Sequence, residues 1–192
     1  MADCTVKLGD PGSIEFHDIL PELGWKVTLA DTGQDTMTGG RLWQIRKYLK
    51  GEEHFCFTYG DGLADVDIAD LVEHHQKSGL ASTITAVRVA GRFGELDINN
   101  DRVTTFNEKP AISAGSINGG FAVLDNKRIW DFFDEREDLV MEQDVFSRLV
   151  QAGQLGVHHH DGFWQCMDTP REFELLNSLW NSKNPPWKTW DD

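Results

Sequence analysis

The sequence predicts an α/β fold in which helices cover a mixed, mostly parallel β-sheet. Apolar runs of strand length alternate with segments whose apolar residues recur at helical spacing. The chain has 192 residues, of which 40% are hydrophobic and 26% charged, so it can bury a core and is not disordered throughout. A turn sequence at 99–101, Asn-Asn-Asp, joins two short strands and predicts one antiparallel excursion.

Local patterns place the individual elements. Leu42 and Ile45 lie at helical spacing and indicate an amphipathic helix. The continuous apolar run 55–59 indicates a strand covered on both faces, and Asp67 and Gly79 are the expected first cap and end of the next helix. In chain order we expect an irregular start at 1–24, a strand at 26–30, a polar loop at 31–40, a helix at 41–49, a strand at 55–59, a helix at 67–77, strands at 82–87, 95–98, 102–107 and 117–124, a helix at 142–152, a strand at 155–159 and a helix at 170–180.

Composition excludes several function classes. The net charge of −14 gives no general attraction for nucleic acid or for an anionic membrane surface. No run of 18 apolar residues predicts a membrane span, and the first residues do not have the pattern of a signal peptide. Three cysteines without a CxxC pair predict a reduced, cytoplasmic protein. Several tryptophans crowd the end of the chain, so we expect the aromatic segment 181–192 to dock on the body.

The strongest local signal for chemistry is Tyr-Gly-Asp-Gly at 59–62. It places the Asp61 carboxylate between two glycines at the carboxyl end of a predicted strand, where α/β sheets bind ligands. A hard oxygen ligand at this place suits Mg²⁺, and an ordinary turn aspartate is the alternative. The neighbouring Asp65, Asp67 and Asp70 are better explained as charges at the start of a helix.

Other polar positions are weaker candidates. Asp168 precedes Thr-Pro, which is also a common helix entry, and Lys109 is also explained as solvated charge. Asn118 begins an Asn-Gly-Gly run that permits close backbone approach, or simply starts a strand. The three histidines at 158–160 lie in a predicted strand, where successive side chains alternate between faces, so we do not expect them to share a zinc ion.

Seven stretches in order resemble the sugar-phosphate nucleotidylyltransferases, and among them the cytidylyltransferases that act on glucose 1-phosphate. They are WKVTLADTGQDTMTGGRL, FTYGDGLADVDI, GRFGELDI, FNEKP, INGGFAVL, DGFWQCMDT and PPWKTW. The resemblance implies a Rossmann-like nucleotidyltransferase layer fold. It also implies that CTP and glucose 1-phosphate are joined with Mg²⁺ into CDP-glucose and pyrophosphate, for O-antigen-type polysaccharide synthesis by a cytoplasmic homo-oligomer.

The resemblance also implies roles for individual residues. It assigns the metal to Asp61 and Asp168, the nucleotide or sugar to Gly60, substrate contacts to Thr36 and Arg41, the sugar phosphate to Lys109, the sugar to Glu108, and the sugar pocket to Gly94 and Asn118. Two alternatives remain open. One is a related enzyme with another base or hexose 1-phosphate, and the other is a non-catalytic fragment that binds sugar phosphate.

One motif of the family has no counterpart here. Members carry a GGxGTRL loop followed by a lysine, which grip the triphosphate, and these 192 residues contain neither in that arrangement. The resemblance therefore implies a single, N-terminally truncated domain over 1–192 that is inactive as this fragment. Because the family's first strand is missing with the loop, we expect the strand at 55–59 to lie at an edge of the sheet.

Overall fold

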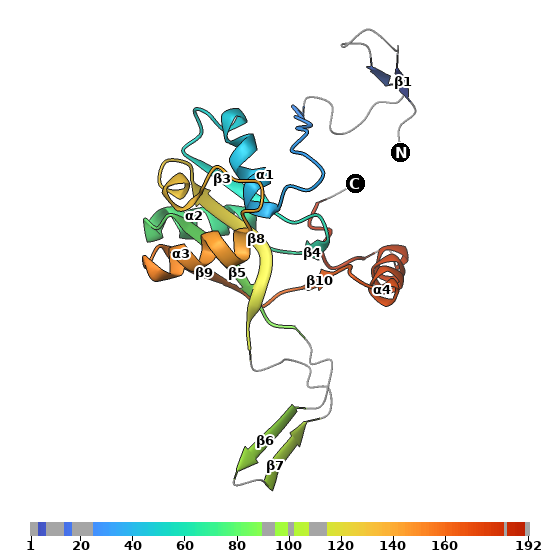
Figure 1. Cartoon of the computed structure of the whole chain (residues 1–192). Coiled ribbons are helices and arrows are strands. Elements are labelled where there is room, and N and C mark those ends of the chain that lie inside the picture. The colour runs from blue at the N-terminus through green and yellow to red at the C-terminus, as the bar shows by residue number, and fades with distance from the viewer. Residues whose placement is uncertain are drawn as a thin grey trace. The chain divides into compact units, whose positions relative to one another are not determined.

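The computed structural model describes residues 4–6, 14–16, 25–89, 95–99, 102–107, 115–182 and 184–190 (Figure 1). The chain forms two compact units, Met1–Asp31 and Thr32–Asp192. In the first unit, β1 (Cys4–Val6) pairs antiparallel with β2 (Ile14–Phe16). The prediction of an irregular start at 1–24 therefore missed a short ladder, although the turn sequence Asp-Pro-Gly at 10–12 lies between its strands.

The strand predicted at 26–30 is not present. Residues 25–33 have no regular secondary structure, and the side chains of Val27 and Leu29 are 70% and 93% exposed. An extended segment becomes a strand only when a neighbouring strand satisfies its backbone N–H and C=O groups. The apolar pattern of this segment gave no information about such a partner.

A four-stranded mixed sheet is the centre of the second unit. Its order is β3 (His54–Thr58), β8 (Ile117–Asp125), β5 (Ser82–Val87) and β9 (Leu155–His160). β5 and β9 are parallel, and β8 runs antiparallel to both of its neighbours, β3 and β5. Three strands therefore share one direction, and the predicted α/β class and mixed sheet are confirmed. The insertion of β8 between β3 and β5 was not predicted.

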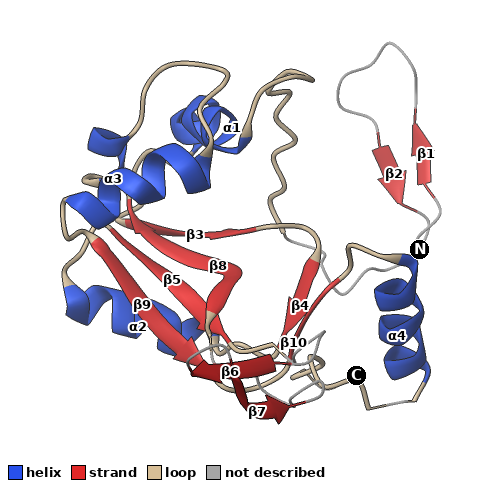
Figure 2. Ribbon diagram, turned by 60° about the horizontal axis from the view of Figure 1, so that its bottom comes forward, coloured by secondary structure: helices blue, strands red, loops and turns tan. Residues whose placement is uncertain are grey.

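Helices cover both faces of this sheet. Figure 2 shows α1 and α3 on one face and α2 on the other. The described helices are α1 (Thr38–Ile45) with a 3₁₀ turn at Arg46–Tyr48, α2 (Ile68–Ser78), a 3₁₀ turn at Ile129–Phe132, a π-helical turn at Met141–Val145 leading into α3 (Phe146–Gln151), and α4 (Pro170–Asn181). The predicted ends of α2 are confirmed, because Asp67 accepts a hydrogen bond from the Asp70 amide at 3.0 Å and Gly79 is left-handed with φ 63°.

Two smaller ladders complete the described strands. β6 (Glu95–Asn99) and β7 (Arg102–Asn107) form the antiparallel hairpin that the Asn-Asn-Asp turn predicted. β4 (Gly62–Ala64) pairs antiparallel with β10 (Trp164–Cys166), which lies about a hundred residues further along the chain. The sequence gave no sign of this second pairing.

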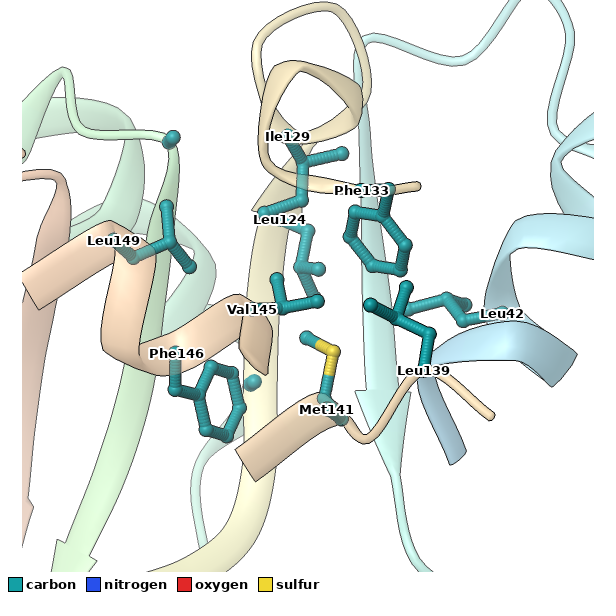
Figure 3. Close-up of a cluster of buried hydrophobic side chains, with 11 residues drawn as sticks. Leu42, Leu124, Ile129, Phe133, Leu139, Met141, Val145, Phe146 and Leu149 are labelled. Carbon is teal, nitrogen blue, oxygen red and sulfur yellow. The ribbon is translucent and has the colours of Figure 1, made fainter. Parts of the chain in front are cut away.

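The main core lies between the sheet and the helices α1 and α3. Figure 3 shows its buried side chains, which are Leu42, Leu124, Ile129, Phe133, Leu139, Met141, Val145, Phe146 and Leu149 together with Ala81 and Ala122. Phe55 of β3 stacks on Trp130 at 5.8 Å between ring centroids and so joins β3 to this core. Close packing of large apolar side chains supplies most of the stabilisation of such a layer.

The strand β3 lies at the edge of the sheet, as expected. Tyr59 donates its amide to Gly120 at 3.3 Å and Asn126 donates to Glu53 at 2.9 Å, so odd-numbered residues of this segment face β8. The backbone groups of Cys56 and Thr58 consequently point away from β8, and both side chains are exposed. Because Cys56 and Thr58 share one face of β3, the prediction of a strand covered on both faces was wrong: an apolar run does not reveal whether each face of a strand is covered by another layer.

The C-terminal segment is anchored by aromatic packing. Trp187 is 9% exposed, and its ring lies 5.5 Å from Phe163 and 6.5 Å from Trp180. Among the helices that the structure describes, none has the length and apolar character needed to cross a bilayer.

Gly40 of α1 is expected to be intolerant of a side chain. A Cβ atom there would lie 2.8 Å from the Glu137 carbonyl oxygen and 2.9 Å from that of Arg136. Alanine favours a helix by about 1 kcal/mol over glycine, but backbone oxygens cannot move aside as a flexible side chain can. We expect Gly40→Ala to lower the free energy of unfolding by about 1–3 kcal/mol in urea denaturation.

The matched control for this prediction is Gly115→Ala, because a Cβ atom at Gly115 meets nothing within 4 Å. Equal stability of the two variants would show that α1 moves away from the 136–139 segment without cost.

Candidate active site

The pairing of β4 with β10 brings the segments that carry the two candidate metal ligands together. Cys166 lies opposite Gly62, and the Met167 amide donates to the Asp61 carbonyl at 2.8 Å. Asp61 directly precedes β4, and Asp168 directly follows Met167, whose amide makes this bond. The two residues therefore lie on adjoining segments. Both side chains are exposed, and the segment of Asp61 directly follows β3, as Figure 1 shows.

Asp168 is held by the first turn of α4. The Glu172 carboxylate accepts the amides of Asp168 at 2.9 Å and Thr169 at 3.0 Å, and the Thr169 hydroxyl accepts the Glu172 amide in return. This capping box satisfies N–H groups that the first turn of a helix leaves open. The helix-entry interpretation of this motif is thus correct for Thr169 and Glu172, and the Asp168 side chain is left exposed.

The segment Thr36–Arg41 approaches the same region from α1. Thr36 is buried, with 4% of its surface exposed. The Arg41 guanidinium donates hydrogen bonds to the Thr32 hydroxyl at 2.8 Å and to the Gln34 carbonyl at 3.0 Å, and these bonds orient it. Met37 and Gly40 donate their amides to the carbonyls of the 137–139 segment. The two glycines of the Thr-Gly-Gly-Arg motif therefore serve close packing against that segment.

A pocket of about 560 Å³ lies between α1 and β3. Its lining includes Thr38, Arg41, Tyr59 and Gly60, and most of its other lining residues are apolar. A Cβ atom at Gly60 would meet nothing within 4 Å, so the space beside this glycine is open to a ligand. Two of the predicted substrate residues, Gly60 and Arg41, consequently line one pocket.

Tyr59 is linked to the pocket wall through Glu142. Its hydroxyl donates to one Glu142 carboxylate oxygen, and the Thr38 hydroxyl donates to the other at 3.2 Å. Burial, and then the hydrogen bond and negative charge of Glu142 with a smaller effect of Asp61, raises the pKa of Tyr59 above its usual range. Tyr59 is therefore a neutral hydrogen-bond donor. The sequence analysis did not single out Glu142, which was visible only as the first residue of the helix predicted at 142–152.

The start of β8 lies on the other side of Gly62. The Trp164 indole donates to the Gly119 carbonyl at 2.7 Å, and the Asn118 side chain accepts the Gly120 amide at 3.0 Å. A Cβ atom at Gly119 would lie 2.7 Å from Val87, so this glycine is required by packing between β8 and β5. Asn118 is exposed near the strand ends, and its predicted role in a sugar pocket stays a prediction.

Three of the predicted site residues, Gly94, Glu108 and Lys109, lie outside the described residues. Among the described side chains, Cys166, Asp168 and Glu172 place ligand atoms within 4.8 Å of one another. Glu172 already accepts two amides and a thiol is a poor ligand for Mg²⁺, so Asp168 is the member best suited to a hard cation.

The consecutive histidines follow the alternation expected of a strand. His158 lies 2.8 Å from the Asp70 carboxylate and His160 lies 2.9 Å from that of Asp65, while His159 is exposed. The side chains of Asp65 and Asp70 are thus engaged with histidines of β9.

Comparison with known proteins decides the family. Residues 15–191 match the family model of the nucleotidyl transferases. The chain belongs to the nucleotidyl transferase family. This nucleotidyl transferase is 44% identical over 191 residues to the glucose-1-phosphate cytidylyltransferase of Salmonella typhimurium, and the match covers 100% of the chain and 73% of that protein. It is 39% identical over 166 residues to the probable glucose-1-phosphate cytidylyltransferase of Bacillus subtilis, covering 86% of the chain and 64% of that protein.

Solved structures agree in fold with this nucleotidyl transferase. A putative glucose-1-phosphate thymidylyltransferase from Bacillus anthracis superposes with a TM-score of 0.64 at 18% identity, covering 89% of the chain and 70% of its own. HddC from Yersinia pseudotuberculosis gives a TM-score of 0.57 at 23% identity, covering 77% and 64%. The predicted nucleotidyltransferase layer fold is therefore confirmed.

Proposed function

We propose that this nucleotidyl transferase transfers a cytidylyl group from CTP to glucose 1-phosphate, giving CDP-glucose and pyrophosphate. The observation that carries the proposal is the junction of β4 and β10, which joins the segments of Asp61 and Asp168 at the carboxyl end of β3. Identity of 44% over the whole chain to proteins named glucose-1-phosphate cytidylyltransferase supports the choice of base and sugar.

A divalent metal, for which we propose Mg²⁺, would be held by Asp61 and Asp168. The donor set fits, because both groups offer hard carboxylate oxygens, both are exposed, and their backbones are joined at 2.8 Å between Met167 and Asp61. When bound, the ion would neutralise charge on the phosphates as a Lewis acid. The overall charge of −14 makes such local neutralisation necessary for an anionic substrate.

The reaction requires positioning more than covalent chemistry by the protein. A phosphate oxygen of glucose 1-phosphate attacks the α-phosphorus of CTP, a new P–O bond forms, and the bond to the bridging oxygen breaks as pyrophosphate leaves. Arg41, held by Thr32 and Gln34, presents a preformed cation at the pocket. We propose that Lys109 offsets the charge of the sugar phosphate, that Glu108, Gly94 and Asn118 contact the sugar, and that Thr36 and Gly60 contact substrate.

Assembly and location belong to the same proposal. We propose a cytoplasmic homo-oligomer acting in polysaccharide synthesis of the O-antigen type. Phe173, Leu175 and Trp180 of α4 are 55%, 45% and 52% exposed, so this helix offers apolar area for contact between copies. Sedimentation velocity of the purified chain measures the assembly.

Pyrophosphate release tests the function. Two polypeptides are compared with CTP, glucose 1-phosphate and Mg²⁺: the 192-residue chain, and the same chain preceded by a GGxGTRL-containing segment of a relative. We expect turnover by the extended polypeptide that exceeds that of the 192-residue chain by at least on the order of 10²–10³, because donors to the developing charge are worth that much each.

Parallel assays with GTP, UTP and dTTP, and with mannose 1-phosphate, test base and sugar choice. A preference for another nucleotide would support a related nucleotidylyltransferase and reject the cytidylyl assignment. Equal turnover by both polypeptides would show that the 192 residues grip the triphosphate by themselves.

A further inference from the structure

Glu142 occupies an unusual position beside the proposed site. It lies on the π-helical turn Met141–Val145, far from Asp61 and Arg41 in sequence, and its side chain is exposed. Its two carboxylate oxygens accept hydrogen bonds from hydroxyls of two different elements, Tyr59 after β3 and Thr38 at the start of α1. A single carboxylate therefore bridges the two sides of the pocket.

The bridge is built into a fixed local structure. The Met141 amide donates to the Thr38 hydroxyl at 2.9 Å, so this hydroxyl both accepts from the turn and donates to it. The turn itself is fastened by Asp144, whose carboxylate accepts the Val140 amide at 2.8 Å and pairs with Arg136 at 2.9 Å. Wide π turns place side chains where an ordinary helix does not, and they recur at functional sites.

Each end of the bridge adjoins a proposed substrate group. Tyr59 immediately precedes Gly60 and Asp61, and Thr38 lies between Thr36 and Arg41. The hydroxyls of Tyr59 and Thr38 are held by one carboxylate whose backbone belongs to neither segment. Movement of either segment relative to the other must break or stretch one of these bonds.

We propose that Glu142 is a positioning residue: it fixes the distance between the Asp61 segment and the Thr36–Arg41 segment by binding the Tyr59 and Thr38 hydroxyls together. This inference rests on the proposed function for its kinetic consequence only. Misplacement of reacting groups by about 1 Å costs on the order of 10²-fold in rate, so a link of this kind has a measurable effect without touching substrate.

The first test needs no substrate. Hydrogen–deuterium exchange is measured on the 192-residue chain and on Glu142→Ala, Glu142→Gln and Gln143→Ala. We expect Glu142→Ala to speed exchange in both 38–45 and 59–62. Glu142→Gln keeps an oxygen that accepts from Tyr59 and an amide that faces Thr38, so it should restore protection. Gln143→Ala, at the exposed neighbour on the same turn, should leave both segments unchanged.

The kinetic test measures kcat and KM for both substrates in the polypeptide that turns over. We expect Glu142→Ala and Tyr59→Phe each to lower kcat/KM by roughly 10- to 100-fold. The double variant should lose no more than the worse single variant, because both remove the same link. Thermal unfolding is measured alongside, and the kinetic assays are run well below the midpoint of every variant.

Two outcomes would overturn the inference. Exchange that rises only in the turn 139–146 of Glu142→Ala would show that the carboxylate does not join the two segments. A stable Glu142→Gln with the same kinetic loss as Glu142→Ala would show that charge, not position, is what the site requires. Failure of the proposed function is separate, since it appears as no turnover of CTP by the unsubstituted polypeptides while the exchange result stands.

Discussion

Asp61→Asn is expected to abolish turnover of CTP and glucose 1-phosphate. The substitution keeps the size of the side chain and removes the negative charge that would bind a divalent ion. Loss of a group that stabilises charge in the transition state costs on the order of 10²–10³ in rate, and loss of the ion adds to this. Pyrophosphate release with Mg²⁺ measures the effect, and binding of Mn²⁺, followed by its electron paramagnetic resonance signal, measures the metal directly.

The control for this prediction is Asp67→Asn, the same change six residues further along. Asp67 caps α2 by accepting the Asp70 amide, and asparagine caps a helix about as well as aspartate. We expect normal turnover for Asp67→Asn and a loss for Asp168→Asn that resembles the loss for Asp61→Asn. Mn²⁺ binding that persists in both Asp61→Asn and Asp168→Asn would refute the proposed metal site.

Acid is expected to weaken the fold through His75. This side chain of α2 is 1% exposed, its ring lies 5.1 Å from that of His54, and its Nδ1 lies 2.9 Å from the Thr83 hydroxyl. Burial, and then the neighbouring His54, lowers the pKa of His75 to about 4, against an ordinary value of about 6.5. The folded protein therefore keeps His75 neutral where the unfolded chain protonates it.

The direction of the effect follows from proton binding. Between about pH 6.5 and pH 4 the unfolded state binds one more proton at His75 than the folded state, so the free energy of unfolding falls as the pH falls. The stability is fully present above about pH 6.5, and the loss amounts to about 3 kcal/mol by pH 4. Hydrogen bonding from the Arg148 side chain lowers the pKa of Asp134. The stability that depends on this ionised carboxylate is therefore lost at a lower pH than the stability lost through His75.

Urea denaturation at pH 7.5, 6.0 and 4.5 measures this loss. In His75→Gln, which keeps a polar group for Thr83 and cannot titrate, the slope of stability against pH should flatten across this window. His159→Gln, at an exposed position of β9, should keep the full slope. If His75→Gln and the unsubstituted chain have the same slope, another group is responsible for the acid sensitivity.

Prediction from the sequence succeeded where the signal was local. The hairpin of β6 and β7, the start of α2 at Asp67, its end at Gly79 and the proline at the start of α4 all depend on residues a few positions apart. Turn geometry, capping and helical spacing are properties of short segments, so they are readable without knowledge of the rest of the fold.

The strands show the limit of such prediction. The segments at 26–30 and 55–59 were both predicted as strands, yet one is without regular structure and the other is an edge strand of the main sheet. β4 and β10, with three residues each, were missed altogether. A strand is defined by its neighbour, and the neighbours here lie about 60 to 100 residues away along the chain.

The sequence by itself determined the class of the fold, both ends of α2 and the start of α4, and its ordered motifs singled out Asp61 and Asp168 as candidate metal ligands. The tertiary structure alone decided that β8 enters between β3 and β5, that β4 and β10 join those two acidic segments, and that Glu142 binds Tyr59 and Thr38. The physical reason is that a cap or a turn gains its free energy within a few residues. Strand pairing and a bridging carboxylate gain theirs from contacts between distant segments, which no local pattern encodes.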